Sequence, residues 1–165
     1  MNSNPTRSLV RSDEIAKLQR SFSHPWNPKS EMIGTRLSKL TQLSRTGVSL
    51  VRLPPRKESF VYHAHHCEEE WAYVLAGRGI AEIDGKEHEV GPGDFMGFAT
   101  PSVAHQIRNP FDAELVYLMG GESREVEIAD FPRHNRRVVR RGSVVEVYPL
   151  DAGKPFGPLN DGRAA

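Results

Sequence analysis

A chain of 165 residues, of which 38% are hydrophobic, is long enough to bury the core of one domain. Its net charge of +1 argues against a polyanion as the main partner, and its single cysteine excludes an intramolecular disulfide. The first 20 residues lack the apolar stretch of a secretory signal, and no apolar run could span a membrane. We therefore expect a soluble, cytoplasmic protein that binds neither nucleic acid nor a membrane.

The N-terminal residues predict little regular structure. Residues 1–5 are expected to be disordered. A short helix is predicted over 12–20, because Ile15 and Leu18 lie at helical spacing and Ser12 can cap the first turn.

The next stretch changes from loop to strand signals. Two prolines in 24–28 break regular structure, so we expect a loop that packs over the core through Phe22 and Trp26. From residue 35 onward, short apolar runs alternate with turn residues, a pattern typical of an all-β barrel or sandwich. Asp84-Gly85 is a strong signal for a two-residue hairpin. Strands are expected over 35–43, 48–53, 59–65, 70–75, 80–83, 88–90, 95–99, 103–108 and 114–119.

The C-terminal region is rich in arginine. The nine residues 133–141 contain five arginines, a run too short on a near-neutral chain to indicate nucleic-acid binding. We expect them to be solvated or to pair with acidic residues of a dimer partner. A further strand over 143–148 would pair with the N-terminal segment or a neighbouring subunit, and 151–165 is expected to be frayed.

Three histidines and a glutamate form the most informative pattern in the chain. His63 and His65 are two residues apart, so on a strand their side chains point to the same face. Glu70 opens the next apolar run, and His105 lies in a later predicted strand. Three imidazoles and a carboxylate suit a divalent transition metal, so we predict that these four residues bind one ion.

These residues also carry a resemblance to a known family. The pattern His63-x-His65-x4-Glu70-x6-Gly77 resembles the first cupin motif, and 92–94 together with His105-x3-Asn109 resembles the second. The resemblance covers about residues 35–120. It implies an all-β fold, the double-stranded β-helix or jelly-roll barrel, in which the matching three histidines and glutamate hold a metal.

The resemblance implies an organisation as well. We expect an N-terminal extension over 1–32, with a short helix and loop, that packs on a cupin barrel over 33–122. A partly flexible C-terminal extension would follow over 123–165. Such barrels commonly pair through edge strands, so a homodimer is expected.

The predicted pocket is mainly apolar. Ser59, Tyr117 and Glu122 are the candidates for binding a small-molecule ligand or substrate. His66 should face away from the metal, and the role of Cys67 stays open. If the strands alternate strictly, the metal-facing side also carries Val61, Ala72, Val74, Val103 and Ile107.

Three classes of function fit this site. The first is an enzyme for a small polar metabolite, either a sugar or sugar-phosphate isomerase using the metal as a Lewis acid, or an Fe(II)-type dioxygenase. The second is a non-catalytic sensor that binds a small ligand. The third, a structural or storage role, is less consistent with the small size. The ligand set suits iron, manganese, nickel, cobalt and zinc about equally.

Overall fold

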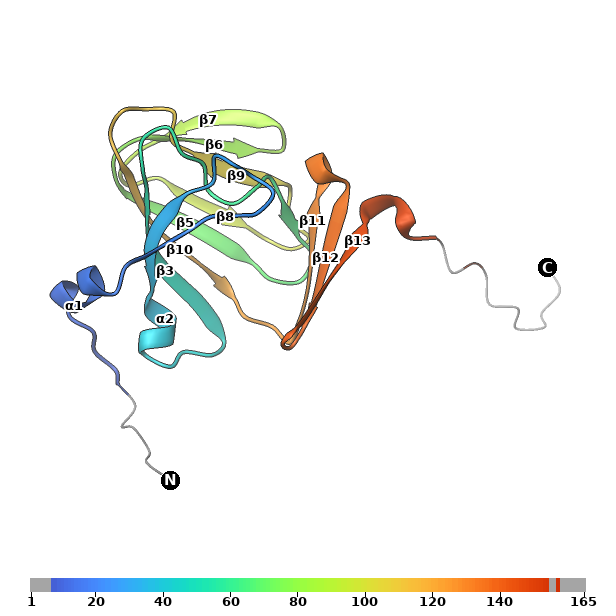
Figure 1. Cartoon of the computed structure of the whole chain (residues 1–165), viewed down its shortest axis with the longest axis horizontal. Coiled ribbons are helices and arrows are strands. Elements are labelled where there is room, and N and C mark those ends of the chain that lie inside the picture. Colours follow the sequence, from blue (N-terminus) through green and yellow to red (C-terminus); the bar gives the residue numbers. More distant parts are fainter. Residues whose placement is uncertain (1–6, 155–156, 158–165) are drawn as a thin grey trace, which may run out of the picture.

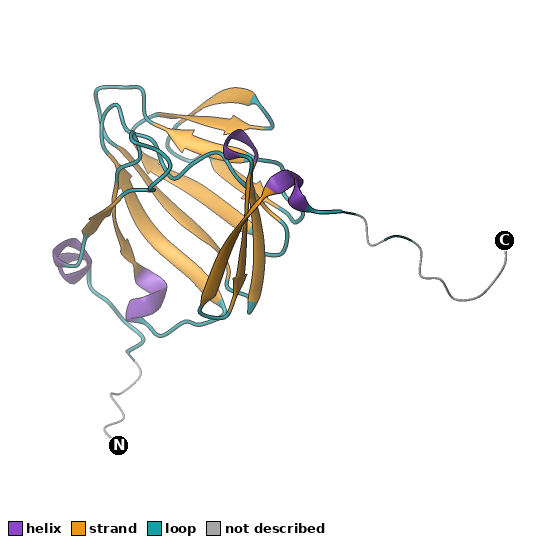
Figure 2. Cartoon of the chain, turned by 45° about the vertical axis from the view of Figure 1, so that its right-hand side comes forward, coloured by secondary structure: helices purple, strands orange, loops and turns teal. Residues whose placement is uncertain are grey.

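Short antiparallel strands make up most of the structure, a computed structural model that describes residues 7–154 and 157 (Figures 1 and 2). Within these residues, no helix combines the length and apolarity needed to cross a membrane. The elements are α1 (Ser12–Lys17), β1 (Arg20–Phe22), β2 (Met32–Arg36), α2 (Leu37–Leu40), β3 (Thr46–Leu53), β4 (Ala64–His65), β5 (Glu70–Ala76), β6 (Gly79–Ile83), β7 (Lys86–Val90), β8 (Phe95–Phe98), β9 (His105–Arg108), β10 (Leu115–Glu122), β11 (Val126–Phe131), β12 (Arg136–Arg141) and β13 (Val144–Pro149), with short 3₁₀ turns at Pro132–His134 and Leu150–Ala152.

The strands form three antiparallel sheets that confirm the predicted all-β jelly-roll barrel. The largest has the order β1-β2-β3-β10-β5-β8, and the others have the orders β13-β12-β11-β4 and β7-β6-β9. Asp84 and Gly85 have φ values of 50° and 72°, as a tight hairpin turn between β6 and β7 requires. A single bridge between His63 and His105 connects β9 to the segment before β4.

The hydrophobic core fills the barrel. Parts of three strands bury every second residue, as the period of a strand requires: Val51 and Leu53 in β3, Ala72 and Val74 in β5, and Leu115 and Tyr117 in β10. A second, smaller cluster joins Val61 to Ala129 and Phe131 of β11. The main cluster consists of Met32, Val51, Leu53, Ala72, Val74, Ala81, Val90, Met96, Phe98, Ile107, Leu115 and Tyr117.

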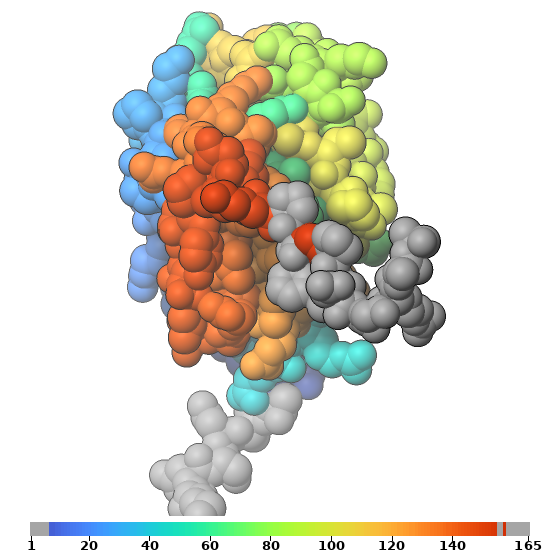
Figure 3. Space-filling view, turned by 90° about the vertical axis from the view of Figure 1, so that its right-hand side faces the viewer, coloured from blue at the N-terminus to red at the C-terminus, as the bar shows by residue number. Residues whose placement is uncertain are grey.

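The C-terminal strands lie against one side of the barrel. Figure 3 shows β11 to β13, in orange and red, between the blue N-terminal segment and the yellow-green strands. Strand β11 pairs with β4 through two residue pairs, Ala129 with His65 and Asp130 with Ala64. Strand β11, which follows the predicted barrel, therefore lies directly beside His65, one of the predicted metal ligands.

Two of the predicted strands are wrong in part. Residues 37–43 form the turn of helix α2 and a loop, because Leu37, Leu40 and Leu43 repeat every three residues, which suits a helical turn. In the stretch 59–65, only Ala64 and His65 are in a regular strand.

Two details of side-chain position also differ from the prediction. Ser12 is the first helical residue, and Arg11 occupies the N-cap position without a side-chain hydrogen bond. Val103 is 47% exposed, because β9 begins only at His105 and strand alternation does not apply before it.

The arginine-rich segment is an ordered part of the C-terminal sheet and not a solvated tail. Part of it forms β12, and β13 pairs with β12 rather than with the N-terminal segment, while pairing of β13 with a neighbouring subunit stays a prediction. Within the same chain, Arg133 pairs with Glu82, Arg137 with Asp130, Arg140 with Glu68 and Arg141 with Glu146. Residues 1–5 and most of 151–165, expected to be disordered and frayed, lie outside the described residues.

Candidate metal centre

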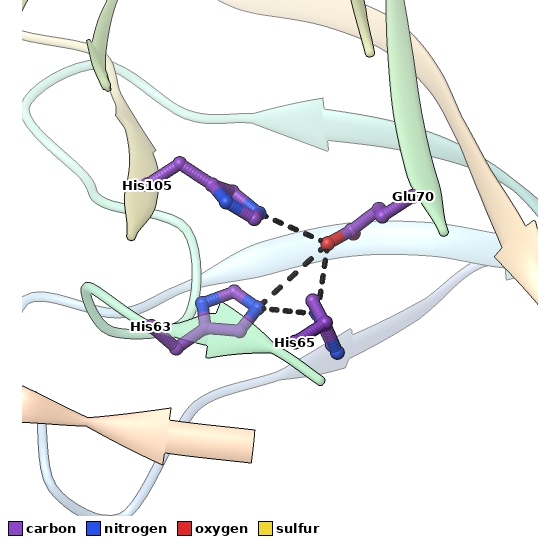
Figure 4. A group of neighbouring side chains, drawn as sticks. All are labelled: His63, His65, Glu70 and His105. Atoms are coloured by element: carbon purple, nitrogen blue, oxygen red, sulfur yellow. Dashed lines mark hydrogen bonds and ion pairs between the residues drawn. The ribbon is translucent and has the colours of Figure 1, made fainter. Parts of the chain in front are cut away.

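Four side chains meet at one point inside the barrel (Figure 4). His65 belongs to β4, and His63 is the residue just before that strand. Glu70 is the first residue of β5, and His105 is the first residue of β9. Their potential ligand atoms all lie within 4.8 Å of one another. Oε2 of Glu70 is 3.1 Å from Nε2 of His65, 3.1 Å from Nε2 of His105 and 3.7 Å from Nε2 of His63.

The outward-facing nitrogen of each ring has an acceptor. Nδ1 of His63 is 2.7 Å from the carbonyl oxygen of Val61, and Nδ1 of His105 is 3.0 Å from that of Val103. A carbonyl oxygen only accepts, so Nδ1 carries the proton in both rings and Nε2 keeps its lone pair. This is the tautomer that a metal-binding histidine needs.

A carboxylate orients the third ring. Nδ1 of His65 is 3.1 Å from Oε1 of Glu127, a buried residue of β11. The Nε2 atoms of His63 and His65 are 3.0 Å apart. With Nδ1 protonated in both rings, two lone pairs face each other at that distance, an arrangement relieved by a proton on one Nε2 or by a metal ion between the two atoms. Three Nε2 atoms and a carboxylate oxygen directed at one point are the donors that a divalent transition metal prefers, so the donor set fits such an ion.

Burial and the neighbouring charges shift the ionisation of the cluster. Burial lowers the pKa of His63 below its usual value, although Glu70 opposes this shift. Burial also acts to lower the pKa of His65, but hydrogen bonds to Glu70 and Glu127 outweigh it and raise the pKa. Burial would raise the pKa of Glu70, but contacts with the three rings hold it well below the usual range, so Glu70 is ionised.

Two aromatic rings hold the imidazoles in place. Phe98 stacks on His105 with ring centroids 3.6 Å apart and an interplanar angle of 6°. Phe131 stacks on His63 at 5.7 Å and 18°. The rings have little freedom to turn, so the ligand atoms are already oriented toward a common centre.

The three predicted substrate-binding residues lie around the cluster, in two different openings. Ser59 and Tyr117 line a cavity of about 30 Å³ that also contacts His63, Glu70 and His105. Their hydroxyls face other groups: Oγ of Ser59 accepts a bond from the amide of Ile107, and the phenol of Tyr117 lies 3.7 Å from Sδ of Met32.

The second opening is larger and acidic. Glu122 lines a space of about 150 Å³ together with His65, Glu69 and Glu70. The carboxylate of Glu122 accepts bonds from Arg124 and from the amide of Glu69. Substrate binding by Ser59, Tyr117 and Glu122 stays a prediction.

Sequence reasoning missed Glu127. It shares the inner face of β11 with Ala129 and Phe131, and this alternation was the available signal. Oε2 of Glu127 is buried without a hydrogen-bond partner in the described part of the chain. His66 points away from the cluster as predicted, with its Nε2 2.8 Å from Oδ2 of Asp130.

Comparison with known proteins identifies similar sequences and folds. Residues 49–121 match the family model of the cupin domain. A crystal structure of a putative sugar phosphate isomerase from Acidithiobacillus ferrooxidans has 29% identity, covers 91% of this chain and 97% of its own, and superimposes with a TM-score of 0.86. A sugar phosphate isomerase of the cupin superfamily from Silicibacter pomeroyi has 25% identity, covers 90% and 96%, and has a TM-score of 0.74.

One curated relative also matches over a short segment. An uncharacterized protein of Methanocaldococcus jannaschii is 38% identical over 47 residues, which is 28% of this chain and 37% of that protein. The match spans little more than a third of that relative, so it adds support for the local sequence pattern alone.

Proposed function

We propose that the chain is a member of the cupin superfamily and a metal-dependent enzyme that isomerises a small sugar or sugar phosphate. Two solved structures that resemble it along most of both chains are described as sugar phosphate isomerases, one of them as putative. This resemblance supports the substrate class, and the donor set supports the metal.

The observation that carries the proposal is the convergence of three Nε2 lone pairs and one ionised carboxylate. His63, His65, Glu70 and His105 would hold the ion. When bound there, a divalent metal supplies Lewis-acid polarisation of a substrate carbonyl or hydroxyl oxygen. The residues Val61, Val103 and Glu127 keep each ring in the ligating tautomer.

An isomerase also needs a group that moves a proton between neighbouring carbons. Glu69 lines the acidic opening beside His65 and Glu70, and its carboxylate forms no ion pair among the described residues. Glu68 and Glu122 in the same opening are paired with Arg140 and Arg124. We assign Glu69 as the base that takes the proton from the hydroxyl-bearing carbon and returns it to the former carbonyl carbon, while the hydroxyl proton passes to the former carbonyl oxygen.

The test combines metal content with proton exchange. The protein, purified without a chelator, is analysed for metals and then incubated in D₂O with aldose phosphates such as ribose 5-phosphate. We expect about one equivalent of metal, and NMR should show the ketose product with deuterium at the carbon that receives the proton. His65→Ala should lose both, whereas Glu69→Gln should keep the metal and lose about 100-fold or more in turnover.

One matched control variant and three contrary outcomes complete this test. Glu125→Gln changes the same charge at an exposed site and should leave metal content and turnover unchanged. Binding of sugar phosphates without turnover would assign a sensor instead. Oxygen consumption with Fe(II) and no isomerisation would assign dioxygenase chemistry. The absence of any metal uptake would overturn the enzymatic proposal.

A further inference from the structure

A larger chamber lies on the N-terminal side of the barrel. It has a volume of about 620 Å³ and is bounded by β1, β2, α2 and β3. Phe22, Leu40, Val51 and Met119 contribute apolar walls. Three cationic residues also line it: Arg20 in β1, Arg36 at the end of β2 and Lys39 in α2.

The charge of this chamber is unbalanced. No carboxylate lines it among the described residues, whereas several arginines elsewhere on the barrel have acidic partners, as in Arg52 with Glu114 at 2.8 Å and Arg78 with Glu89 at 2.9 Å. Among the described residues, Arg20, Arg36 and Lys39 form no ion pair. The guanidinium of Arg20 donates only to the carbonyl of its neighbour Gln19. Three positive charges around one space favour an anion.

The strand register connects this chamber to the metal cluster. Arg36 is paired across the sheet with Ser49, Ser49 with Met119, and Met119 with Ala72. Directly paired residues share a face of the sheet, and Ala72 shares its face with Glu70, two positions earlier on β5. Arg36 and Glu70 therefore lie on the same inner face.

The lining residues show the same continuity. Met119 and Phe60 line both the chamber and the small cavity at the cluster. Arg36 and Ser49 line both the chamber and the acidic opening beside Glu70. The chamber and the cluster are thus adjacent compartments separated by a few side chains.

We propose that this chamber binds the phosphate group of a small phosphomonoester, through Arg20, Arg36 and Lys39. This assignment rests on the proposed function, since it identifies the charged end of the substrate of the same site. A dianionic phosphate matches three cations better than a single carboxylate does.

Size and charge fix the orientation of such a ligand. Arg36 and Ala72 are separated by three strand-to-strand spacings of about 4.8 Å, which is about 14 Å across the sheet. The long side chain of Arg36 covers part of this distance. A short sugar phosphate spans that gap. In the acidic opening, Glu69 forms no ion pair among the described residues and lies with His65 and Glu70, whereas Arg36 lies on the chamber side, so the phosphate is drawn to Arg36 and the uncharged end faces the cluster.

The test measures phosphate recognition separately from catalysis. Calorimetry on the protein as purified compares ribose 5-phosphate with ribose, and inorganic phosphate with benzoate. We expect the two phosphates to bind more tightly than ribose and benzoate. In Arg36→Gln and Arg20→Gln, the affinity for phosphate should fall by about tenfold or more, while metal content stays at the wild-type level.

The matched control is Arg45→Gln, which removes the same charge at an exposed position outside the chamber lining. It should bind both phosphates like the wild type. Equal phosphate affinity in all variants would overturn the proposal, as would benzoate binding as tightly as phosphate, or no phosphate binding at all. Loss of phosphate binding in the two chamber variants supports the proposal even if no isomerisation is observed, so its failure is distinct from failure of the proposed reaction.

Discussion

Each imidazole of the cluster is fixed by contacts that leave only its Nε2 atom free. His105 has a stacked phenyl ring on one side and a carbonyl acceptor at Nδ1, and His63 has the same kind of environment. These side chains therefore lose their conformational entropy when the protein folds, and little further entropy is lost when an ion binds. Such a site should lose affinity when either a ligand or its orienting partner is changed.

His105→Ala removes a ligand while the barrel remains folded. We expect metal affinity to fall by more than about 100-fold, because loss of a residue that only orients a ligand already costs about 10–100-fold. Loss of the stack with Phe98 should reduce stability by about 1 kcal/mol beyond the loss of buried area. Elemental analysis and circular dichroism measure the two effects. His88→Ala, at an exposed site in β7, is the control, and wild-type metal affinity in His105→Ala would show that the four-ligand assignment is wrong.

Glu127→Gln tests the orienting contact. The amide oxygen can still accept from Nδ1 of His65, but the charge that makes His65 a stronger ligand is lost. We expect metal affinity to fall by about 10-fold, with little change in melting temperature because Oε2 has no partner to lose. Competition with a chromogenic chelator gives the affinity, and Glu125→Gln is the control. An unchanged metal affinity would show that Glu127 does not orient His65 for metal binding and contributes only to packing.

At the scale of elements, β10 holds the site together. It pairs with β3 on one side and β5 on the other, with one register shift between Val116 and Tyr117. Gly120 allows Trp71 to pack closely, since a Cβ at that position would lie 2.5 Å from its ring. The relative positions of Glu70 and the cationic chamber therefore depend on the register of this strand.

The turn between β5 and β6 gives a test of this arrangement. Gly77 has a φ of +77°, and a Cβ there would lie 2.0 Å from the carbonyl oxygen of Glu114. Gly77→Ala should destabilise the protein by about 2–3 kcal/mol, which lowers the melting temperature by about 4–12 °C. Gly85 also has a positive φ but nothing within 4 Å, so Gly85→Ala should lose only about 1 kcal/mol. Equal melting temperatures for the two variants would contradict the steric argument.

The sequence alone predicts a feature best when the residues that form it are neighbours in the chain. His63 and His65 are two residues apart, and the hairpin at Asp84-Gly85 is local, so both could be recognised without the fold. Glu127 lies 62 residues from His65 in the chain and reaches it only because β11 pairs with β4. Arg36 is placed beside the cluster by the register of three strand pairs, which no local pattern specifies.

At the scale of the whole molecule, the C-terminal strands are held to the barrel by packing and by ion pairs. Phe131 packs against Trp26 and His63, with centroid distances of 5.1 and 5.7 Å. The extension thus contributes to the site through both Phe131 and Glu127. The boundaries at 32/33 and 122/123 and the homodimer stay predictions, and light scattering of the purified protein tests the latter.

Asp130 is the ion-pair partner whose loss should be easiest to measure. It accepts two bonds from Arg137, at 2.6 and 2.7 Å, and one from His66 at 2.8 Å. The bond from Arg137 lowers the pKa of Asp130, although burial opposes this, and His66 adds to the lowering. A lowered carboxyl pKa stabilises the fold above the unfolded value of about 3.9, and this stabilisation is lost as the pH falls through the lower, folded value.

Asp130→Asn should therefore destabilise the protein near neutral pH. Below about pH 4, its stability should fall less steeply with decreasing pH than that of the wild type. Because Arg137 is 36% exposed, we expect a loss of about 1 kcal/mol, or about 2–4 °C in melting temperature. Thermal unfolding followed from neutral to acidic pH measures both effects. Asp112→Asn breaks a surface ion pair with Arg56 and should change stability little, because the two side chains are 89% and 64% exposed. If the stability of Asp130→Asn declines in acid in parallel with that of the wild type and of Asp112→Asn, then Arg137 and His66 do not stabilise the C-terminal strands through Asp130.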